Sequence, residues 1–352
     1  MKLVKWIASL CSIVALTSNV SPAIAGKAPE VSALMTPDEH VRKEDQTFLT
    51  LPEWFLVHSP DEYAQHLKKE SPSMFPFFGH IQQFWQTYRA VYRQTKDVYS
   101  FNYGYHVMVM TIGVSTTVEY ALKGAYESVI GTLTEGKNLS ERTDEDIYAA
   151  KVAQDYVDFI KVDPWYKFDF KKALKGLWDL PTSGKYPIRK WERRYFLTSE
   201  YLVKAGYGWL IGKATAAGYD APMPVTAVVF ETRNEAALKK VPGLSALKKI
   251  DKNTFIGTLP RYAAFTPSAV ALAKAGAEFK EVAGNSRFIL VSILPGISFE
   301  SSSLYGNIVL TQPILTDPGS RRIVYKIPMN NLRAALDAFG SHGVKVEHIY
   351  DF

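Results

Sequence analysis

The feature that most constrains this chain is a helical segment that the sequence repeats. Residues 117–134 (TVEYALKGAYESVIGTLT) and residues 198–215 (TSEYLVKAGYGWLIGKAT) are identical at eight of eighteen positions, at a constant offset of 81 residues. The shared Glu, Lys, Tyr and Ile recur at i, i+4, i+7 and i+11, which places them on one face of an α-helix. The chain is therefore expected to build two similar helices, each with an ionisable stripe on an otherwise apolar body.

The first 25 residues have the features of a secretory signal peptide. Lys2 and Lys5 form a charged start, an apolar run follows from Trp6 to Thr17, and Ala23-Ile24-Ala25 matches a cleavage site. The apolar run is too short to span a bilayer comfortably. We therefore predict cleavage after Ala25 and export to the periplasm, in preference to a retained membrane anchor.

Cleavage would remove the only cysteine, Cys11, and leave a mature chain of 327 residues (352 minus 25). Such a chain has no disulfide, no thiolate nucleophile and no cysteine metal ligand, and its length predicts two domains. Losing Lys2 and Lys5 lowers the formal net charge from +6 to +4. No long basic run is present, so we expect no nucleic-acid partner.

The pattern of the mature chain changes once. Residues 26–46 are polar and predict a flexible lead-in, and residues 47–221 carry helical periodicities. Ala221-Pro222-Met223-Pro224 interrupts the pattern, and residues 225–352 are rich in strand-like runs. We predict an α+β protein: an N-terminal, mostly helical domain, followed by a C-terminal α+β domain of sandwich type with helices on one face of a mixed sheet.

Two hairpins and a central strand are expected within the C-terminal domain. Residues 277–283 and 287–294 form one predicted hairpin, and residues 307–315 and 321–327 form another. The run 288–294 is apolar on both faces apart from Ser292, which is typical of a strand inside a sheet.

Residues 98–118 contain no Asp, Glu, Lys or Arg. Their length would allow a transmembrane helix, but Ser and Thr residues dilute the run and Glu119 follows at once. The sequence therefore favours a helix buried inside the helical domain. His106 has no second histidine at helical spacing, so it indicates a core residue and no metal site.

The chain also lacks the common catalytic signatures. There is no G-x-S-x-G elbow, Walker loop, Rossmann glycine pattern, H-E-x-x-H or E-x-x-H sequence. We expect no cofactor and no metal.

Three segments resemble a family of exported bacterial proteins of uncharacterised function: Leu51 to Ser59, Phe101 to Met110 and Glu119 to Glu127. The resemblance covers most of the mature chain. It implies export, and it implies no activity, cofactor or site.

The paired stripes supply the candidate site. The residues proposed to converge between the two helices, with two nearby glutamates and one histidine, are Glu119, Lys123, Tyr126, Glu200, Lys204, Tyr207, Glu127, Glu192 and His106. The hypothesis places the helices about a local two-fold axis, with Gly131 and Gly212 permitting close approach. The simpler interpretation is ordinary surface pairing of Glu and Lys at i, i+4, worth about 0.2–0.5 kcal/mol per pair.

Three functional classes follow from these observations. The first is a non-enzymatic exported binding or scaffold protein, with a small or apolar ligand between the striped helices. The second is an enzyme that uses the Glu, Lys and Tyr cluster for acid–base chemistry. The third is a membrane-associated protein whose glycine-rich apolar helices contact a bilayer peripherally.

Overall fold

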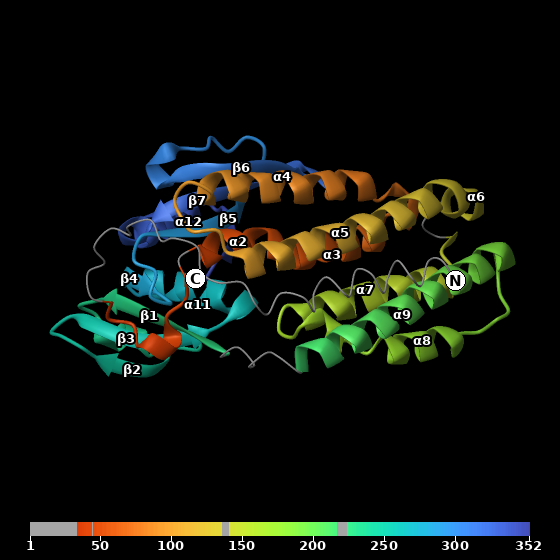
Figure 1. The fold of residues 1–352 in the computed structure, drawn as a ribbon. Coiled ribbons are helices and arrows are strands. Elements are labelled where there is room, and N and C mark those ends of the chain that lie inside the picture. The colour runs from red at the N-terminus through yellow and green to blue at the C-terminus, as the bar shows by residue number, and fades with distance from the viewer. Residues whose placement is uncertain (1–33, 44, 136–140, 217–223) are drawn as a thin grey trace. The chain divides into compact units, whose positions relative to one another are not determined.

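The C-terminal strands form two antiparallel sheets in the computed structural model, which describes residues 34–43, 45–135, 141–216 and 224–352 (Figure 1). The first sheet has the order β2-β3-β1-β4, and the second has the order β6-β7-β5-β8. The strands in chain order are β1 (Val225–Glu231), β2 (Ser245–Lys249), β3 (Thr254–Pro260), β4 (Glu278–Val282), β5 (Phe288–Leu294), β6 (Asn307–Ile314), β7 (Asp317–Pro328) and β8 (Lys345–Ile349).

Both sheets are built by the same chain path: a strand, a hairpin, a helix and a last strand. Helices α11 (Phe265–Lys274) and α12 (Leu332–Ser341) begin 67 residues apart, and β4 and β8 also begin 67 residues apart. Each helix is followed by a glycine with positive φ, 87° at Gly276 and 66° at Gly343. At this offset, residues 254–282 and 321–349 share only three of 29 identities. The sequence therefore gives almost no sign of this duplicated unit.

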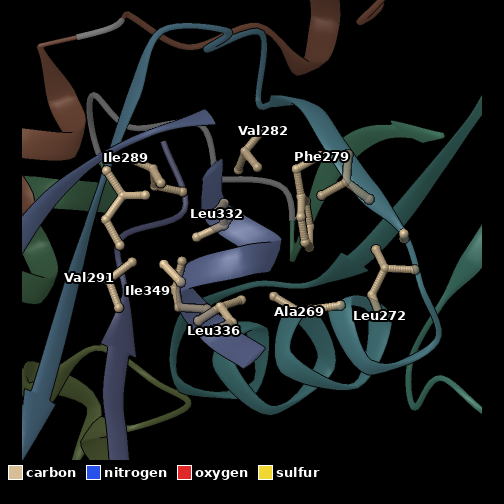
Figure 2. Packing of buried hydrophobic residues seen from close by; sticks show 14 of the residues in the cluster. Ala269, Leu272, Phe279, Val282, Ile289, Val291, Leu332, Leu336 and Ile349 are labelled. Carbon is tan, nitrogen blue, oxygen red and sulfur yellow. The ribbon is translucent and has the colours of Figure 1, made fainter. Parts of the chain in front are cut away.

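The main core lies where α11 and α12 pack against strands from both sheets (Figure 2). Alternate residues of β5, Ile289, Val291 and Ile293, point into this core. The intervening Leu290 belongs to a second cluster, because successive side chains of a strand point to opposite faces.

Two N-terminal helices form the other side of that second cluster. Phe48 and Leu49 of α2 (Gln46–Glu53) and Val91 of α4 (Phe77–Thr95) pack with Leu290 of β5. The second sheet is thus covered on both faces, which explains why β5 is apolar on both faces apart from Ser292. The prediction that β5 is a central strand is confirmed, since β5 pairs with both β7 and β8.

The remaining helices form the part of the fold that holds the candidate site. They are α3 (Phe55–Lys69), α5 (Tyr103–Tyr126), the π-helix η3 (Glu127–Gly131), α6 (Thr132–Thr134), α7 (Asp144–Ile160), the 3₁₀ turn η5 (Trp165–Lys167), α8 (Phe170–Trp178) and α9 (Pro187–Ala216). Helix α3 packs on α7, α4 packs on α5, and α8 packs on α9. A capping box in which Thr143 and Asp146 bond reciprocally starts α7.

The α+β class is confirmed, with helices first and strands after them. The details differ in three places. The strands form two antiparallel sheets instead of one mixed sheet, and the predicted hairpin of residues 277–294 is wrong because β4 and β5 join different sheets. In the predicted flexible lead-in, Thr36 is buried, and its side chain and main-chain N–H donate to Glu281. The residues from Leu34 onward belong to one compact unit.

The remaining organisational predictions fall outside the described residues. The signal peptide, residues 26–33 and most of the predicted break at 221–224 lie there. Cleavage and the domain boundary therefore stay predictions. The strand β1 begins directly after Pro224.

Helix α5 is not buried in the way the sequence predicts. One face, with His106, Val109, Gly113, Thr116 and Tyr120, is buried, and the opposite face is exposed. Within the described residues, none of the helices combines the length and apolarity needed to cross a bilayer.

Candidate functional site

Four of the predicted residues meet between the two repeated helices. Lys123 Nζ lies 3.1 Å from Glu119 Oε1 and 2.7 Å from Glu200 Oε1. Lys204 Nζ lies 3.1 Å from the same Glu119 oxygen and 2.9 Å from the same Glu200 oxygen. Charges thus alternate around a closed square, which we call the tetrad. Helix α5 supplies Glu119 and Lys123, and the equivalent positions of α9 supply Glu200 and Lys204.

The tetrad holds each of its members in one charge state. Burial raises the pKa of Glu200, but Lys123 and Lys204 outweigh burial and lower that pKa to about 2. The same two lysines outweigh burial at Glu119 and lower its pKa. Burial lowers the pKa values of the lysines, and the two carboxylates more than offset that effect and raise them. At neutral pH the tetrad therefore has two negative and two positive groups and no net charge.

A cavity of about 100 Å³ lies beside the tetrad. Its apolar wall comes from α3, α7, α8 and α9, and includes Phe55, Leu67, Val152, Phe170 and Leu197. The ammonium of Lys123 lies 5.4 Å from the ring centre of Tyr63, and that of Lys204 lies 5.4 Å from Tyr156. The site thus combines aromatic and aliphatic walls with a balanced set of charges.

The repeated glycines do not act as the hypothesis proposed. A Cβ at Gly131 would lie 2.2 Å from a carboxylate oxygen of Glu127, so this glycine makes room for a folded-back side chain of its own helix. A Cβ at Gly212 would be 3.7 Å from the ring of Tyr166. Long side chains of the tetrad, and not close backbone approach, connect α5 to α9.

Three further candidates belong to a buried ion-pair network next to the tetrad. Tyr126 donates to Glu192 at 2.8 Å, and Glu127 pairs with Arg193 at 2.7 Å. The ion pairs fall into two groups, which we call together the ion-pair network. One group is Glu127, Asp146, Arg189, Glu192 and Arg193, and the other is Glu145, Lys190 and Arg194 with the exposed Asp144.

This ion-pair network joins the start of α9 to the start of α7 and to η3. Arg193 and Arg194 are 2% and 1% exposed, and Glu145 is fully buried. Arg194 donates to Glu145 at 2.7 Å and to two main-chain carbonyls. Because Glu127 and Glu192 each accept hydrogen bonds from arginines of α9, they act as structural residues that fix the register of α9.

The last two candidates lie apart from the tetrad. Tyr207 stacks on Trp165 with ring centres 5.4 Å apart. His106 lies 3.0 Å from the Tyr88 hydroxyl and stacks on Phe101 at 4.2 Å. His106 is thus a core histidine with a polar partner, as the sequence predicts.

A second buried polar cluster escaped sequence reasoning. Ser59 lies inside α3, and its Oγ is 2.9 Å from His80 Nδ1 and 2.8 Å from the Tyr120 hydroxyl. Arg322 of β7 donates to Glu62 of α3 at 3.0 Å and pairs with Glu347 of β8.

The sequence held no signal for this cluster, because Glu62 and Arg322 are 260 residues apart. The cluster reaches the cavity through Tyr120, whose side chain lines it. Ser59 is 1% exposed and does not line the cavity, so it does not present a nucleophile there.

The tetrad predicts non-additive effects of mutation. Glu119→Gln or Glu200→Gln leaves one carboxylate to serve both lysines, and the double variant leaves neither lysine with a partner. We expect the double variant to lose more stability than the sum of the single variants, with a coupling of about 0.5–3 kcal/mol. Urea unfolding of the four proteins in this cycle measures it.

The matched control for Glu119→Gln is Glu231→Gln, because the Glu231 side chain is 45% exposed, compared with 40% at Glu119, and pairs with Lys280 at 3.1 Å. Its effect should be close to zero. Effects in the cycle that add within about 0.5 kcal/mol would contradict a coupled tetrad.

Comparisons with known protein families, with curated proteins and with solved structures found no match. The family resemblance and export therefore stay predictions. Among the described residues, no group of three or more His, Cys, Asp or Glu side chains is placed to hold a metal ion.

Proposed function

We propose that this protein is an exported, non-enzymatic binding protein, and that the cavity beside the tetrad holds a small zwitterionic molecule. The observation that carries the proposal is the charge-balanced square of Glu119, Lys123, Glu200 and Lys204 on the wall of an otherwise apolar and aromatic cavity. A pocket with a few placed polar groups among apolar walls is the usual form of a small-molecule site.

Charge balance indicates the class of ligand. A simple cation or anion would bring an uncompensated charge into a partly buried, neutral site, which is costly. A zwitterion adds no net charge, and can place its ammonium near the glutamates and its carboxylate near the lysines. The cavity volume of about 100 Å³ restricts the ligand to a small molecule.

The protonation states favour binding over acid–base catalysis. A general acid or base works best when its pKa lies near the working pH. In the tetrad the pKa of Glu200 is lowered to about 2 and those of both lysines are raised, so none of these three exchanges a proton readily at neutral pH. This supports a binding protein over the alternative of an enzyme that uses the same residues.

Native mass spectrometry of the protein from its own host tests export and binding separately. The expected protein mass is that of a chain beginning at Gly26, and a mass that includes Met1 would contradict export. A small bound molecule that is released on denaturation is the expected sign of binding.

Thermal unfolding with three probes tests the ligand class. Alanine should stabilise the protein, whereas propionate and ethylamine, which each carry one of its two charges, should not. Saturation at about 100 times the dissociation constant adds about 2.7 kcal/mol. Glu119→Gln should abolish the effect, and the matched control Glu231→Gln should keep it. Equal stabilisation by all three probes, or no stabilisation with no retained molecule, would contradict the proposal.

A further inference from the structure

Helices α5 and α9 have their charged side chains on the inside. Within residues 103–134, the only Asp, Glu, Lys and Arg residues are Glu119, Lys123 and Glu127, and each is buried or partly buried. Within residues 187–209 of α9, every charged side chain is likewise buried or partly buried. A helix on the surface of a water-soluble protein normally has the opposite arrangement.

The exposed sides of these helices are apolar and aromatic. We call them together the outer face, which consists of Met110, Val114, Val118, Leu122, Val129, Ile130, Leu133, Ile188, Trp191, Tyr195, Leu202, Val203 and Trp209. On α9 this face extends over 22 residues, or about 33 Å at 1.5 Å per residue. Figure 1 shows α5 and α9 as long helices.

Both helices present their apolar residues on the same side of the pair. The helices run antiparallel, since Glu119 contacts Lys204 while Tyr126 contacts Glu192. Val118 and Leu122 directly precede the tetrad residues of α5, and Val203 directly precedes Lys204. In an antiparallel pair with a local two-fold axis, equivalent positions lie on one side. The outer face is therefore one continuous surface.

The hydroxyl groups on this surface are satisfied within their own helices. The exposed Ser and Thr residues of the two helices donate to main-chain carbonyls: Ser115 to Ile112, Ser128 to Gly124, Thr132 to Glu127 and Ser199 to Tyr195, at 2.6–3.0 Å. Such bonds also occur outside this surface, as at the exposed Ser341 of α12, and here they mean that these hydroxyls do not require a partner from water.

Basic and aromatic side chains lie at the edge of the outer face. Trp178 of α8 lies 6.5 Å from Trp191, and Lys171 and Lys175 precede Trp178 by seven and three residues on the same stripe of α8. At the other end, Lys213 Nζ lies 4.3 Å from the ring centre of Trp209. Tryptophan, tyrosine and lysine are the residues that favour the boundary between lipid and water.

We propose that the outer face of α5 and α9 lies on the surface of a lipid bilayer that contains anionic lipids. The apolar stripe contacts the acyl chains, and the lysines of α8 and Lys213 contact the phosphates. A protein partner is the less suitable occupant, because the outer face has no exposed charge and no free Ser or Thr hydroxyl to fix the register of a specific interface. This inference stands independently of a ligand in the cavity.

Flotation of the full chain with vesicles tests the proposal. We expect the protein to float with phosphatidylcholine vesicles that contain phosphatidylglycerol, and less with phosphatidylcholine alone or at high salt. Its tryptophan emission should shift to the blue and be quenched by brominated acyl chains. Leu122→Glu and Val203→Glu should each lower the vesicle partition coefficient about tenfold or more, because each places a charge in the apolar face.

The matched controls are Ile297→Glu and Val162→Glu. These residues are 67% and 72% exposed, compared with 68% at Leu122 and 70% at Val203, and they lie outside the outer face. They should leave flotation unchanged, and all four variants should unfold as the parent does. Absence of flotation with both vesicle types would overturn the proposal. A lipid-free dimer that Leu122→Glu dissociates would assign the face to a second copy of the chain and overturn it equally.

Discussion

Replacing Arg193 by methionine is expected to lower the free energy of unfolding by about 3–5 kcal/mol, the usual cost of removing one partner from a buried ion pair. Arg193 is 2% exposed and its partner Glu127 is 1% exposed, so the variant would leave a carboxylate buried without its main counter-charge. Burial already raises the pKa of Glu127, and Arg193 partly offsets this. Chemical denaturation of the two proteins at neutral pH measures the loss.

Two variants separate burial from charge in this experiment. Arg333→Met removes a half-exposed arginine that pairs with Glu278 and Asp337, and should cost about 1 kcal/mol or less. Adding Glu127→Leu to Arg193→Met should recover part of the loss, because apolar residues often replace a buried ion pair well. A cost for Arg193→Met as small as that for Arg333→Met would show that the ion-pair network does not fix α9.

The second prediction with a large effect is a loss of stability in acid. The loss should begin at a pH well above the range in which exposed carboxylates titrate. Burial lowers the pKa of His58 to about 4 and that of His80 to about 3, and it also lowers the pKa of His348. Between about pH 6.5 and 4, the unfolded chain binds protons that the folded chain does not bind. Stability therefore falls as the pH falls, by about 1.4 kcal/mol per pH unit for each histidine.

Other groups modify this slope in known directions. Burial raises the pKa of Asp351 to about 6, so this group stabilises the fold as the pH falls from about 6 to 4 and cancels one histidine. Burial also lowers the pKa values of His66 and His106, which steepens the decline, and raises those of Glu53, Glu62 and Glu127, which opposes it. The pKa values of Glu200 and Glu347 are lowered to about 2, so the decline should continue below about pH 4.5.

Urea unfolding from about pH 7 to about pH 4 measures this dependence. His80→Gln should reduce the slope by about one proton. Ser59→Ala, which removes a hydrogen-bonding partner of His80 without removing a titratable group, should lower stability and leave most of the slope. A stability that does not change between pH 6.5 and 4.5 would contradict the buried, neutral histidines.

The tetrad could be predicted from the sequence because the prediction depends only on residues that lie close together within each helix. The spacing of Glu119 and Lys123 and its repetition at Glu200 and Lys204 define two helix faces, and opposite charges on such faces attract. The same reasoning was wrong about Gly131. Sequence spacing does not show whether a glycine makes room for a side chain of its own helix or for a second helix, and Gly131 makes room for a side chain of its own helix. It was also wrong about α5, because a run of apolar residues does not reveal whether protein covers it.

Contacts between residues that are far apart in the sequence could not be predicted from it. Arg322 reaches Glu62 across 260 positions, and neither residue lies in a recognisable pattern. The duplicated unit of the two sheets was equally hidden, since its halves keep the alternation of buried residues and the glycine after each helix but few identities. Buried residues at alternate positions and a glycine after each helix are enough to keep the same chain path, and most other side chains can differ.

The contact between α2 and the chain around Tyr350 has a consequence for the order in which the protein folds. Thr47 of α2 donates to the main-chain carbonyl of Tyr350, 303 residues later, and Phe48 and Leu49 pack in the cluster that includes Tyr350. Loop closure over such a distance must precede any gain from the contact. The second cluster therefore cannot close until Tyr350 has been synthesised and has left the ribosome. Until then, α2 and α4 keep an apolar side uncovered, which is the state that a chaperone can hold.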